Sequence, residues 1–175
     1  MSHIFLDLET LDLRPSAVIT EIAAVEFDPQ SFDIGRRLDL HLSADDQVML
    51  GRTVDPETVT WHEEQGHSIK MAEGLNLALA LSKLHDWVSA VEPERVWAWG
   101  PDFDRPVLES ACRRIDLEIP WPYFNTMDAR TIWNLAFPTT KRPKRPHAAL
   151  GDCLAGVNDL RTALSKLNLV DPCYV

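Results

Sequence analysis

The alternation of hydrophobic and polar positions predicts three strands within the first 42 residues. His3 to Leu11 begins with an apolar run and continues as alternating acids and apolar residues. Ala17 to Phe27 is rich in Val, Ile and Ala and ends at an Asp-Pro turn, and Gly35 to Leu42 alternates leucines with polar residues. We therefore expect the third strand to be half exposed and to lie antiparallel to the second.

Helical spacing of apolar residues begins after a stretch that has no clear period. Residues 45–53 fit neither repeat, and we predict a loop there. Asp55 and Pro56 form a typical helix start, which predicts a short helix to about Gln65. A longer apolar stripe predicts a second helix from about Ala72 to Val91.

The second half of the chain predicts one more strand and three more helices. Arg95 to Trp99 is a short apolar strand, and residues 100–106 turn it into a helix whose apolar face is Val107, Leu108, Ala111, Cys112 and Ile115. Residues 120–122 are predicted to be a surface connection. Residues 127–131 lead into a helix that ends near Phe137, and the last helix runs from about Ala148 to Leu167.

Two acids stand out in the first predicted strand. The period of a strand puts Asp7 and Glu9 on one face, where their charges repel each other. A buried strand that carries two such acids calls for a cation between them, and carboxylate ligands favour Mg²⁺ or Mn²⁺ over zinc. The alternative is that both acids sit at an exposed strand end.

Length and composition are typical of one globular domain over residues 1–175. The three cysteines form no C-x-x-C pair, which favours a reducing, cytoplasmic setting. Acids near the start of the chain argue against a signal peptide, and no apolar run reaches the length of about 18 residues that a membrane span needs.

The net charge of -10 argues against nucleic-acid binding through a broad basic face. It permits a compact pocket that holds a chain end through bound metal ions. One basic cluster interrupts the acidity, namely Lys141, Arg142, Lys144 and Arg145. It has two interpretations, a solvated loop or a site that attracts phosphate.

Several residues favour a structural interpretation over a functional one. His62 and His67 are five positions apart, which does not suit the i, i+4 spacing of zinc ligands on a helix. Trp97, Trp99 and Phe103 flank a turn and could stack on bases, although core packing is the commoner use of tryptophan.

Two further acids and one histidine complete the candidate chemistry. Asp102 and Asp104 follow the fourth strand, where an aspartate serves either as a helix N-cap or as a ligand at the end of a sheet. His147 follows the basic cluster, and Asp152 lies five residues later in the last helix.

This set of residues resembles the DnaQ-like 3′-5′ exonucleases of the DEDDh type along nearly the whole chain. The resemblance is carried by the Asp-x-Glu of the first strand, by Asp104, and by His147 with Asp152. Within this superfamily, the segments 7–11, 58–61, 99–104 and 128–131 resemble the exonuclease VIII-like and RNase AS-like branch. The chain departs from this pattern in the short loop before Phe103, in the extra acid Asp102, and in Gly151, where another acid is often seen.

The resemblance implies an RNase H-like α/β fold, with a mixed five-stranded sheet flanked by helices. It also implies a 3′-5′ exonuclease that releases 5′-mononucleotides from single-stranded nucleic acid with two Mg²⁺ or Mn²⁺ ions. Asp7 would bridge both ions, Glu9 and Asp152 would hold one, and Asp104 would support the other. His147 would be the general base, and the terminal nucleotide would contact Thr10, Leu11 and, less strongly, Trp61 and Phe103.

The resemblance leaves the substrate open. Likeness to exonuclease VIII slightly favours DNA, whereas likeness to RNase AS implies a 3′-5′ exoribonuclease and, by itself, a homodimer. An alternative from another class is a catalytically inactive binding module that keeps the fold. Such a module predicts a missing ligand, and all five positions are filled.

Overall fold

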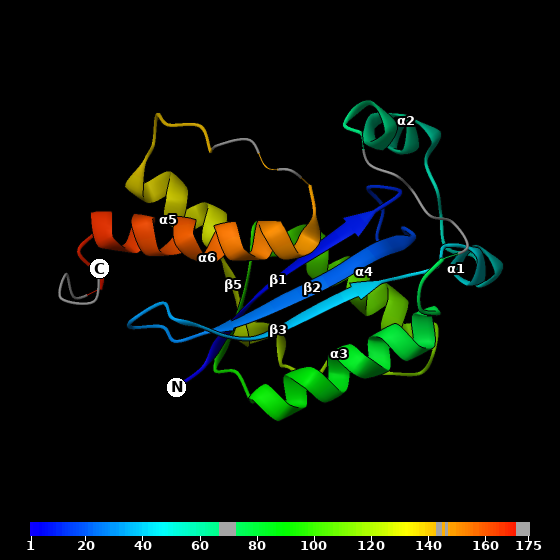
Figure 1. Ribbon diagram of the computed structural model, residues 1–175, viewed down its shortest axis with the longest axis horizontal. Helices are drawn as coiled ribbons and strands as arrows, with labels where there is room; N and C mark the ends of the chain where they lie inside the picture. Colours follow the sequence, from blue (N-terminus) through cyan, green and yellow to red (C-terminus); the bar gives the residue numbers. More distant parts are fainter. Residues whose placement is uncertain (67–72, 143–144, 146, 171–175) are drawn as a thin grey trace.

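The computed structural model describes residues 1–66, 73–142, 145 and 147–170. Its centre is a mixed five-stranded sheet in the order β3-β2-β1-β4-β5, which confirms the expected α/β architecture (Figure 1). β1 pairs antiparallel with β2 and parallel with β4. The strands are β1 (His3–Thr10), β2 (Ile19–Phe27), β3 (Ile34–His41), β4 (Arg95–Ala98) and β5 (Thr126–Asp128).

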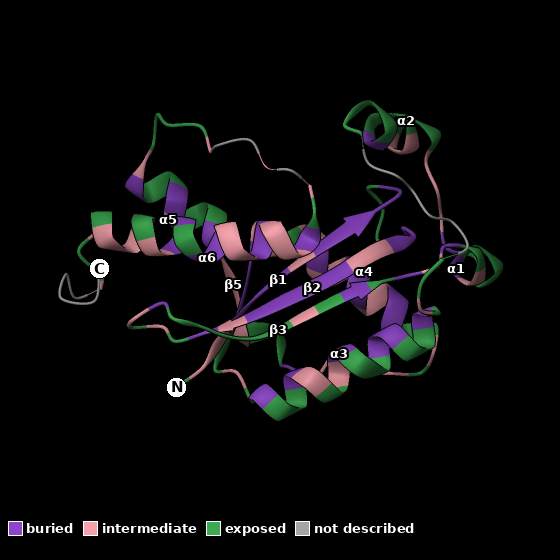
Figure 2. Ribbon diagram, viewed as in Figure 1, coloured by how far each residue is buried: buried purple, intermediate pink, exposed green. Residues whose placement is uncertain are grey.

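Helices cover both faces of the sheet and make two apolar cores. On one face α3 and α4 pack against Ile4, Leu6 and Leu8, and on the other α6 packs against Phe5 and the β2 side chains (Figures 1 and 2). The helices are α1 (Asp45–Met49), α2 (Pro56–Glu64), α3 (Leu77–Val91), α4 (Pro101–Arg113), α5 (Ala129–Ala136) and α6 (Ala149–Lys166). Among the described residues, no helix is long and apolar enough to cross a bilayer.

Central strand β1 decides where the acids lie. Its even-numbered residues Ile4 and Leu6 face α3 and α4, so odd-numbered Phe5 faces α6. Gly156 of α6 lies so close to Phe5 that a Cβ there would be 2.4 Å from the ring carbon Cζ. Asp7 and Glu9 continue this face towards the carboxyl end of β1, which lies between α2 and the start of α6 (Figure 1).

Three predictions of local structure were wrong. Residues 45–53 include the one-turn helix α1, whose buried residue is the polar Gln47, bonded to the main chain of Ile19. The helix expected from Ala72 begins at Leu77, because Asn76 is its N-cap and accepts a hydrogen bond from the Leu79 N–H. Residues 120–122 are not wholly at the surface, since Trp121 is buried beside β5, a strand that the sequence did not predict.

Candidate active site

The two predicted acids of β1, Asp7 and Glu9, lie near the carboxyl end of that strand. Glu9 is buried and lies opposite Glu21 of β2 in the sheet register. Asp7 is half-buried and lies opposite Ala23. Both predicted acids therefore project from the same face of the central strand, as the sequence implies, and neither sits at an exposed strand end.

Asp104 reaches the same region from α4. The helix begins after Gly100, whose φ of 91° lies in the left-handed region that favours glycine. Gly100 is the N-cap, so the prediction that Asp102 or Asp104 could cap this helix is wrong. Asp104 is buried and accepts a hydrogen bond from the Leu8 N–H, which places its carboxylate against β1 between Asp7 and Glu9.

Asp102 does not compete with Asp104 for a place at the site. Its side chain is 77% exposed and pairs with Arg130 of α5, with 2.9 Å between Oδ1 and Nη2. The acid that departs from the family pattern thus belongs to a surface ion pair.

His147 and Asp152 arrive from the start of α6. His147 has a φ of 53°, which turns the chain just before the helix. Asp152 is buried in the first turn. One ligand atom from each of Glu9, His147 and Asp152 lies within 4.8 Å of the others, so the first strand and the last helix of the fold meet at this point. The His147 ring also contacts Trp61 of α2 edge to face, with 4.7 Å between centroids.

Crowded carboxylates shift each other's proton affinities. Burial raises the pKa of Glu9 to about 8, with help from the charges of Glu21 and Asp152. Burial also raises the pKa of Asp104 to about 7. The pKa of Asp7 is well above its ordinary value because of burial first and of its acidic neighbours second.

A divalent cation suits this group of residues. Oxygen ligands at close range, held in partly desolvated surroundings, are the donors that Mg²⁺ and Mn²⁺ prefer. A cation among them would offset the mutual repulsion that holds their pKa values up. Asp7, Glu9, Asp104 and Asp152 therefore fit the ion-binding role that the resemblance implies.

Glu21 is a part of the site that the sequence analysis missed. Its Oε2 accepts a hydrogen bond from the Ala149 N–H at 3.0 Å. Helix α6 has no side-chain cap of its own at Ala148, so this carboxylate from β2 takes that place. Glu21 thus ties the start of α6, between His147 and Asp152, to the sheet that carries Glu9.

A cavity of about 430 Å³ opens beside the acids, between the end of β1 and α2. Its walls combine apolar and polar side chains, namely Leu8, Glu9, Thr10, Leu13, Asp55, Glu57, Thr58, Trp61, His62 and Phe103. Trp61 is 38% exposed and Phe103 half-buried, so both offer ring surface to a ligand. Three predicted contact residues, Thr10, Trp61 and Phe103, thus line one cavity.

Leu11 is placed differently from the other predicted contact residues. It is fully buried and packs with Val18 and Ala44. Its N–H donates to the Val18 carbonyl, so the residue anchors the strand end and offers no surface to a nucleotide.

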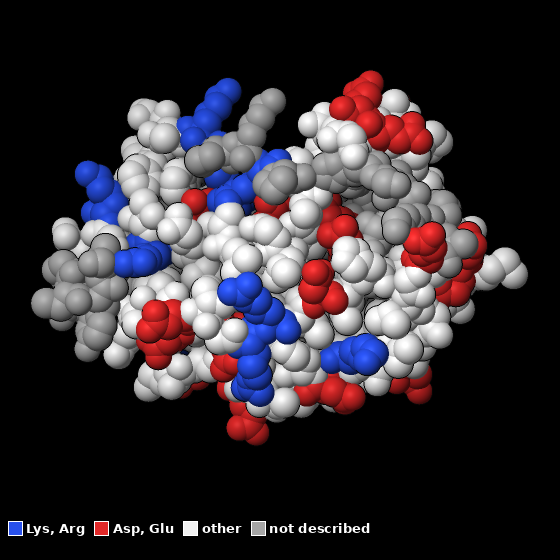
Figure 3. Space-filling model, viewed as in Figure 1, with Lys and Arg blue, Asp and Glu red and all other residues white. Residues whose placement is uncertain are grey.

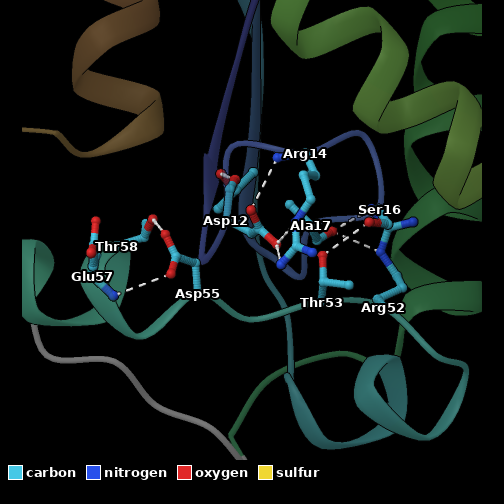
Figure 4. Close-up of polar contacts among 10 residues, drawn as sticks. Asp12, Arg14, Ser16, Ala17, Arg52, Thr53, Asp55, Glu57 and Thr58 are labelled. Carbon is cyan, nitrogen blue, oxygen red and sulfur yellow. Dashed lines mark hydrogen bonds and ion pairs between the residues drawn. The ribbon is translucent and has the colours of Figure 1, made fainter.

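Hydrogen bonds hold in place residues 12–17 and the start of helix α2, which border the cavity (Figure 4). The Asp12 carboxylate accepts from Arg14 Nε at 2.7 Å, and Arg52 Nε donates to the Ala17 carbonyl at 2.8 Å. Asp55 caps α2 by accepting from the Glu57 N–H. His62 Nε2 lies 2.9 Å from the Thr10 carbonyl, which joins α2 directly to the end of β1.

The basic segment before α6 is not a simple solvated loop. Arg142 and Arg145 both pair with Asp159 of α6, and their side chains are only 18% and 12% exposed. Lys141 is exposed, whereas Lys144 lies outside the described residues. Figure 3 shows Lys and Arg side chains gathered beside this segment, with carboxylates near them.

The tryptophans Trp97 and Trp99, for which the sequence favoured core packing, both contact other rings in the fold. Trp97 is buried, and its Nε1 donates to His3 Nδ1 at 3.1 Å. Trp99 packs near Trp133 with 6.1 Å between ring centroids. These contacts confirm packing for the buried Trp97, whereas Trp99 is half-buried and also lines a cleft. His67, the second member of the rejected zinc pair, lies outside the described residues.

Residues 2–164 match the model of a family described as the Rv2179c-like 3′-5′ exoribonuclease domain. This chain belongs to that family. The match confirms the resemblance to DnaQ-like exonucleases and makes the chain a member of a 3′-5′ exonuclease family. No curated protein matches the chain significantly.

Solved structures of exonuclease I share the fold of this exoribonuclease-family domain. E. coli exonuclease I in complex with a dA16 oligonucleotide has a TM-score of 0.73 and 17% identity, over 95% of this chain and 41% of that one. The complex with a dT13 oligonucleotide has a TM-score of 0.65 and 19% identity, over 95% and 40%. The chain therefore spans about two fifths of these structures, and the likeness confirms the RNase H-like fold.

Proposed function

We propose that this domain, residues 1–175, removes 5′-mononucleotides from the 3′ end of single-stranded RNA with the help of Mg²⁺ or Mn²⁺. One observation supports it most: Glu9 of β1 and Asp152 of α6 meet beside His147, Asp104 of α4 accepts a hydrogen bond from the Leu8 N–H of β1, and a cavity of about 430 Å³ opens next to Glu9. That volume is typical of a small-molecule site and suits one nucleoside. The homodimer that the resemblance implies stays a prediction.

Four carboxylates would hold the metal ions. Glu9 and Asp152 would share one ion with Asp7, and Asp104 would support a second. Bound divalent ions supply a water nucleophile at neutral pH and neutralise charge on the phosphoryl group that is being transferred.

The remaining residues would place the substrate and move a proton. His147 would take the proton from the attacking water, and its edge contact with Trp61 would orient the imidazole. Trp61 and Phe103 would hold the terminal base in the cavity by stacking. Glu21 would keep His147 at a fixed distance from Glu9 through the Ala149 N–H.

RNA takes precedence over DNA as the proposed substrate, which reverses the slight preference in the sequence analysis. The family description names an exoribonuclease, and it covers residues 2–164. The structures with bound deoxyoligonucleotides belong to proteins that are less than 20% identical to this chain, so they support the fold more than the substrate.

The test is product analysis on matched single strands. RNA and DNA of one sequence, labelled at the 5′ end, are incubated with the protein in Mg²⁺ or Mn²⁺, with and without EDTA. We expect a ladder that shortens from the 3′ end, faster on RNA than on DNA, with 5′-mononucleotide products and no reaction in EDTA. The matched control is Asp7→Asn, which keeps the side-chain shape and should give no ladder.

Other outcomes would contradict the proposal. Internal cuts would refute exonuclease action, and faster loss of DNA would refute the substrate. A wild-type protein that binds RNA but leaves it intact with both metals would favour the inactive binding module.

A further inference from the structure

A second cleft lies between α5 and residues 138–142, apart from the cavity beside α2. Its volume is about 380 Å³. Aromatic rings and cations line it together, namely Trp99, Trp133 and Phe137 with Arg130, Lys141 and Arg142. Arg130 pairs with Asp102 and Arg142 with Asp159, whereas the exposed Lys141 adds positive charge at the rim of the cleft.

The aromatic and cationic groups of this cleft are stacked on one another. The Arg142 guanidinium lies 3.5 Å from the centroid of the Trp99 ring. Trp133 packs against Phe137, with 4.6 Å between ring centroids. Arg142 Nε donates to Asp159, which fixes the guanidinium over the indole. Arg142 is 18% exposed and lines the cleft, so the part of its guanidinium that Trp99 and Asp159 leave uncovered is available to a base and its phosphate.

The cleft adjoins the metal-binding acids. Arg130 lies against Gly100, where an added Cβ would be 2.8 Å from the guanidinium. Gly100 is the residue at which α4, the helix of Asp104, begins. The Arg130 side chain therefore lies beside the turn from which α4 carries Asp104 towards β1.

We propose that this cleft binds the nucleotides immediately upstream of the scissile phosphate in a single-stranded substrate. This inference rests on the proposed function, in which the cavity beside α2 takes the terminal nucleoside. Arg142 and the aromatic rings would accept an upstream base, and Arg130 and Lys141 would contact the phosphates that flank it. The strand would thus be held on both sides of the metal site.

The test uses the exposed end of the cleft, because Arg142 is tied into the fold through Asp159. Lys141 is exposed, so Lys141→Glu should fold normally. Arg130→Gln is the second variant. Lys83→Glu is the matched control, since Lys83 is exposed on α3, across the sheet, and makes the same charge change.

Binding is measured by fluorescence anisotropy with 5′-fluorescein oligoribonucleotides of two, four and eight residues in Ca²⁺. We expect Lys141→Glu to weaken the binding of the two longer strands by about tenfold and that of the dinucleotide less. The slope of log Kd against log salt should fall by about 0.7 for each phosphate that the variant no longer binds. Lys83→Glu should match the wild type.

Hydrolysis gives a second readout that depends on strand length. The ratio of kcat/KM for a tetranucleotide to kcat/KM for the p-nitrophenyl ester of uridine 5′-monophosphate should fall about tenfold in Lys141→Glu. Equal binding by wild type and both cleft variants would overturn the inference, as would equal losses in Lys83→Glu. If the wild type cuts no RNA but Lys141→Glu still weakens binding, the proposed function fails and the cleft remains a strand-binding site.

Discussion

Replacing Glu9 with Gln should stabilise the metal-free protein, and the gain should increase with pH. In the folded protein Glu9 keeps its proton up to about pH 8, since burial and its acidic neighbours raise its pKa to about 8 from 4.5. In the unfolded chain the same group releases its proton near its ordinary pKa. Rising pH therefore favours the unfolded wild type between these two values, because unfolding releases a proton.

The size of the effect follows from the width of this pH interval. Over the pH interval in which Glu9 is ionised only in the unfolded state, each unit of pH lowers the free energy of unfolding by about 1.4 kcal/mol. From pH 5 to pH 7.5 the wild type should thus lose about 3 kcal/mol relative to Glu9→Gln, whose amide does not titrate. Below the ordinary pKa both states hold the proton and this difference vanishes.

Urea unfolding at pH 5, 6 and 7.5 in EDTA measures the difference directly. Glu26→Gln on neighbouring β2 is the control, because the pKa of Glu26 is shifted in the opposite direction. The hydrogen bond from Arg36 lowers the pKa of the Glu26 carboxyl to about 2. The Glu26 carboxylate stabilises the folded protein fully at pH 5 and above. The loss of unfolding free energy caused by Glu26→Gln should therefore stay constant from pH 5 to pH 7.5. A difference between wild type and Glu9→Gln that does not change with pH would refute the reasoning.

Three other substitutions test separate parts of the site and fold. His147→Ala should lower kcat about 10²- to 10⁴-fold while calorimetry shows Mn²⁺ binding retained, and equal loss of Mn²⁺ affinity would contradict the general-base role. Glu21→Ala should lower kcat about tenfold, because it removes the acceptor of the Ala149 N–H, whereas Glu21→Gln keeps an acceptor and should stay near wild type; equal losses in both would exclude this role. Gly156→Ala should cost about 1–3 kcal/mol in urea unfolding, since its Cβ meets the Phe5 ring, and an unchanged stability would contradict that close packing.

The main strands and the face of the acids could be predicted because strand periodicity is local. Ile4 and Leu6 pack in the core on one face of the sheet, and Phe5 packs in the core on the other face. The two-residue period of a strand then places Asp7 and Glu9 on the same face as Phe5. The family resemblance implied a mixed five-stranded sheet, and the short connection predicted the antiparallel pairing of β2 with β3. The order of the other strands was not predicted, because the sequence pattern does not report distant pairing partners.

Short or polar elements could not be predicted from the same pattern. Helix α1 is one turn long, and its buried side chain is the amide of Gln47, so it has no apolar period. Strand β5 has only three residues, none of them fully buried. Both depend on tertiary contacts that a local window does not contain.

The remaining site features are contacts that charged side chains make with residues far away in the sequence. Glu21 is one of two acids in the mostly apolar β2, which was the available signal, but its partner Ala149 lies 128 residues away. The role of Arg142 and Arg145 likewise depends on Asp159, which lies 17 and 14 residues further along the chain in α6. Sequence spacing suggested chemistry near residue 147 without showing which cations were already paired.

Anomalous scattering from crystals grown with Mn²⁺ tests the central claim most directly. We predict manganese peaks among Asp7, Glu9, Asp104 and Asp152, and their loss in Asp7→Asn crystals grown in the same way. Crystals with saturating Mn²⁺ and no peak within bonding distance of these carboxylates would contradict the account.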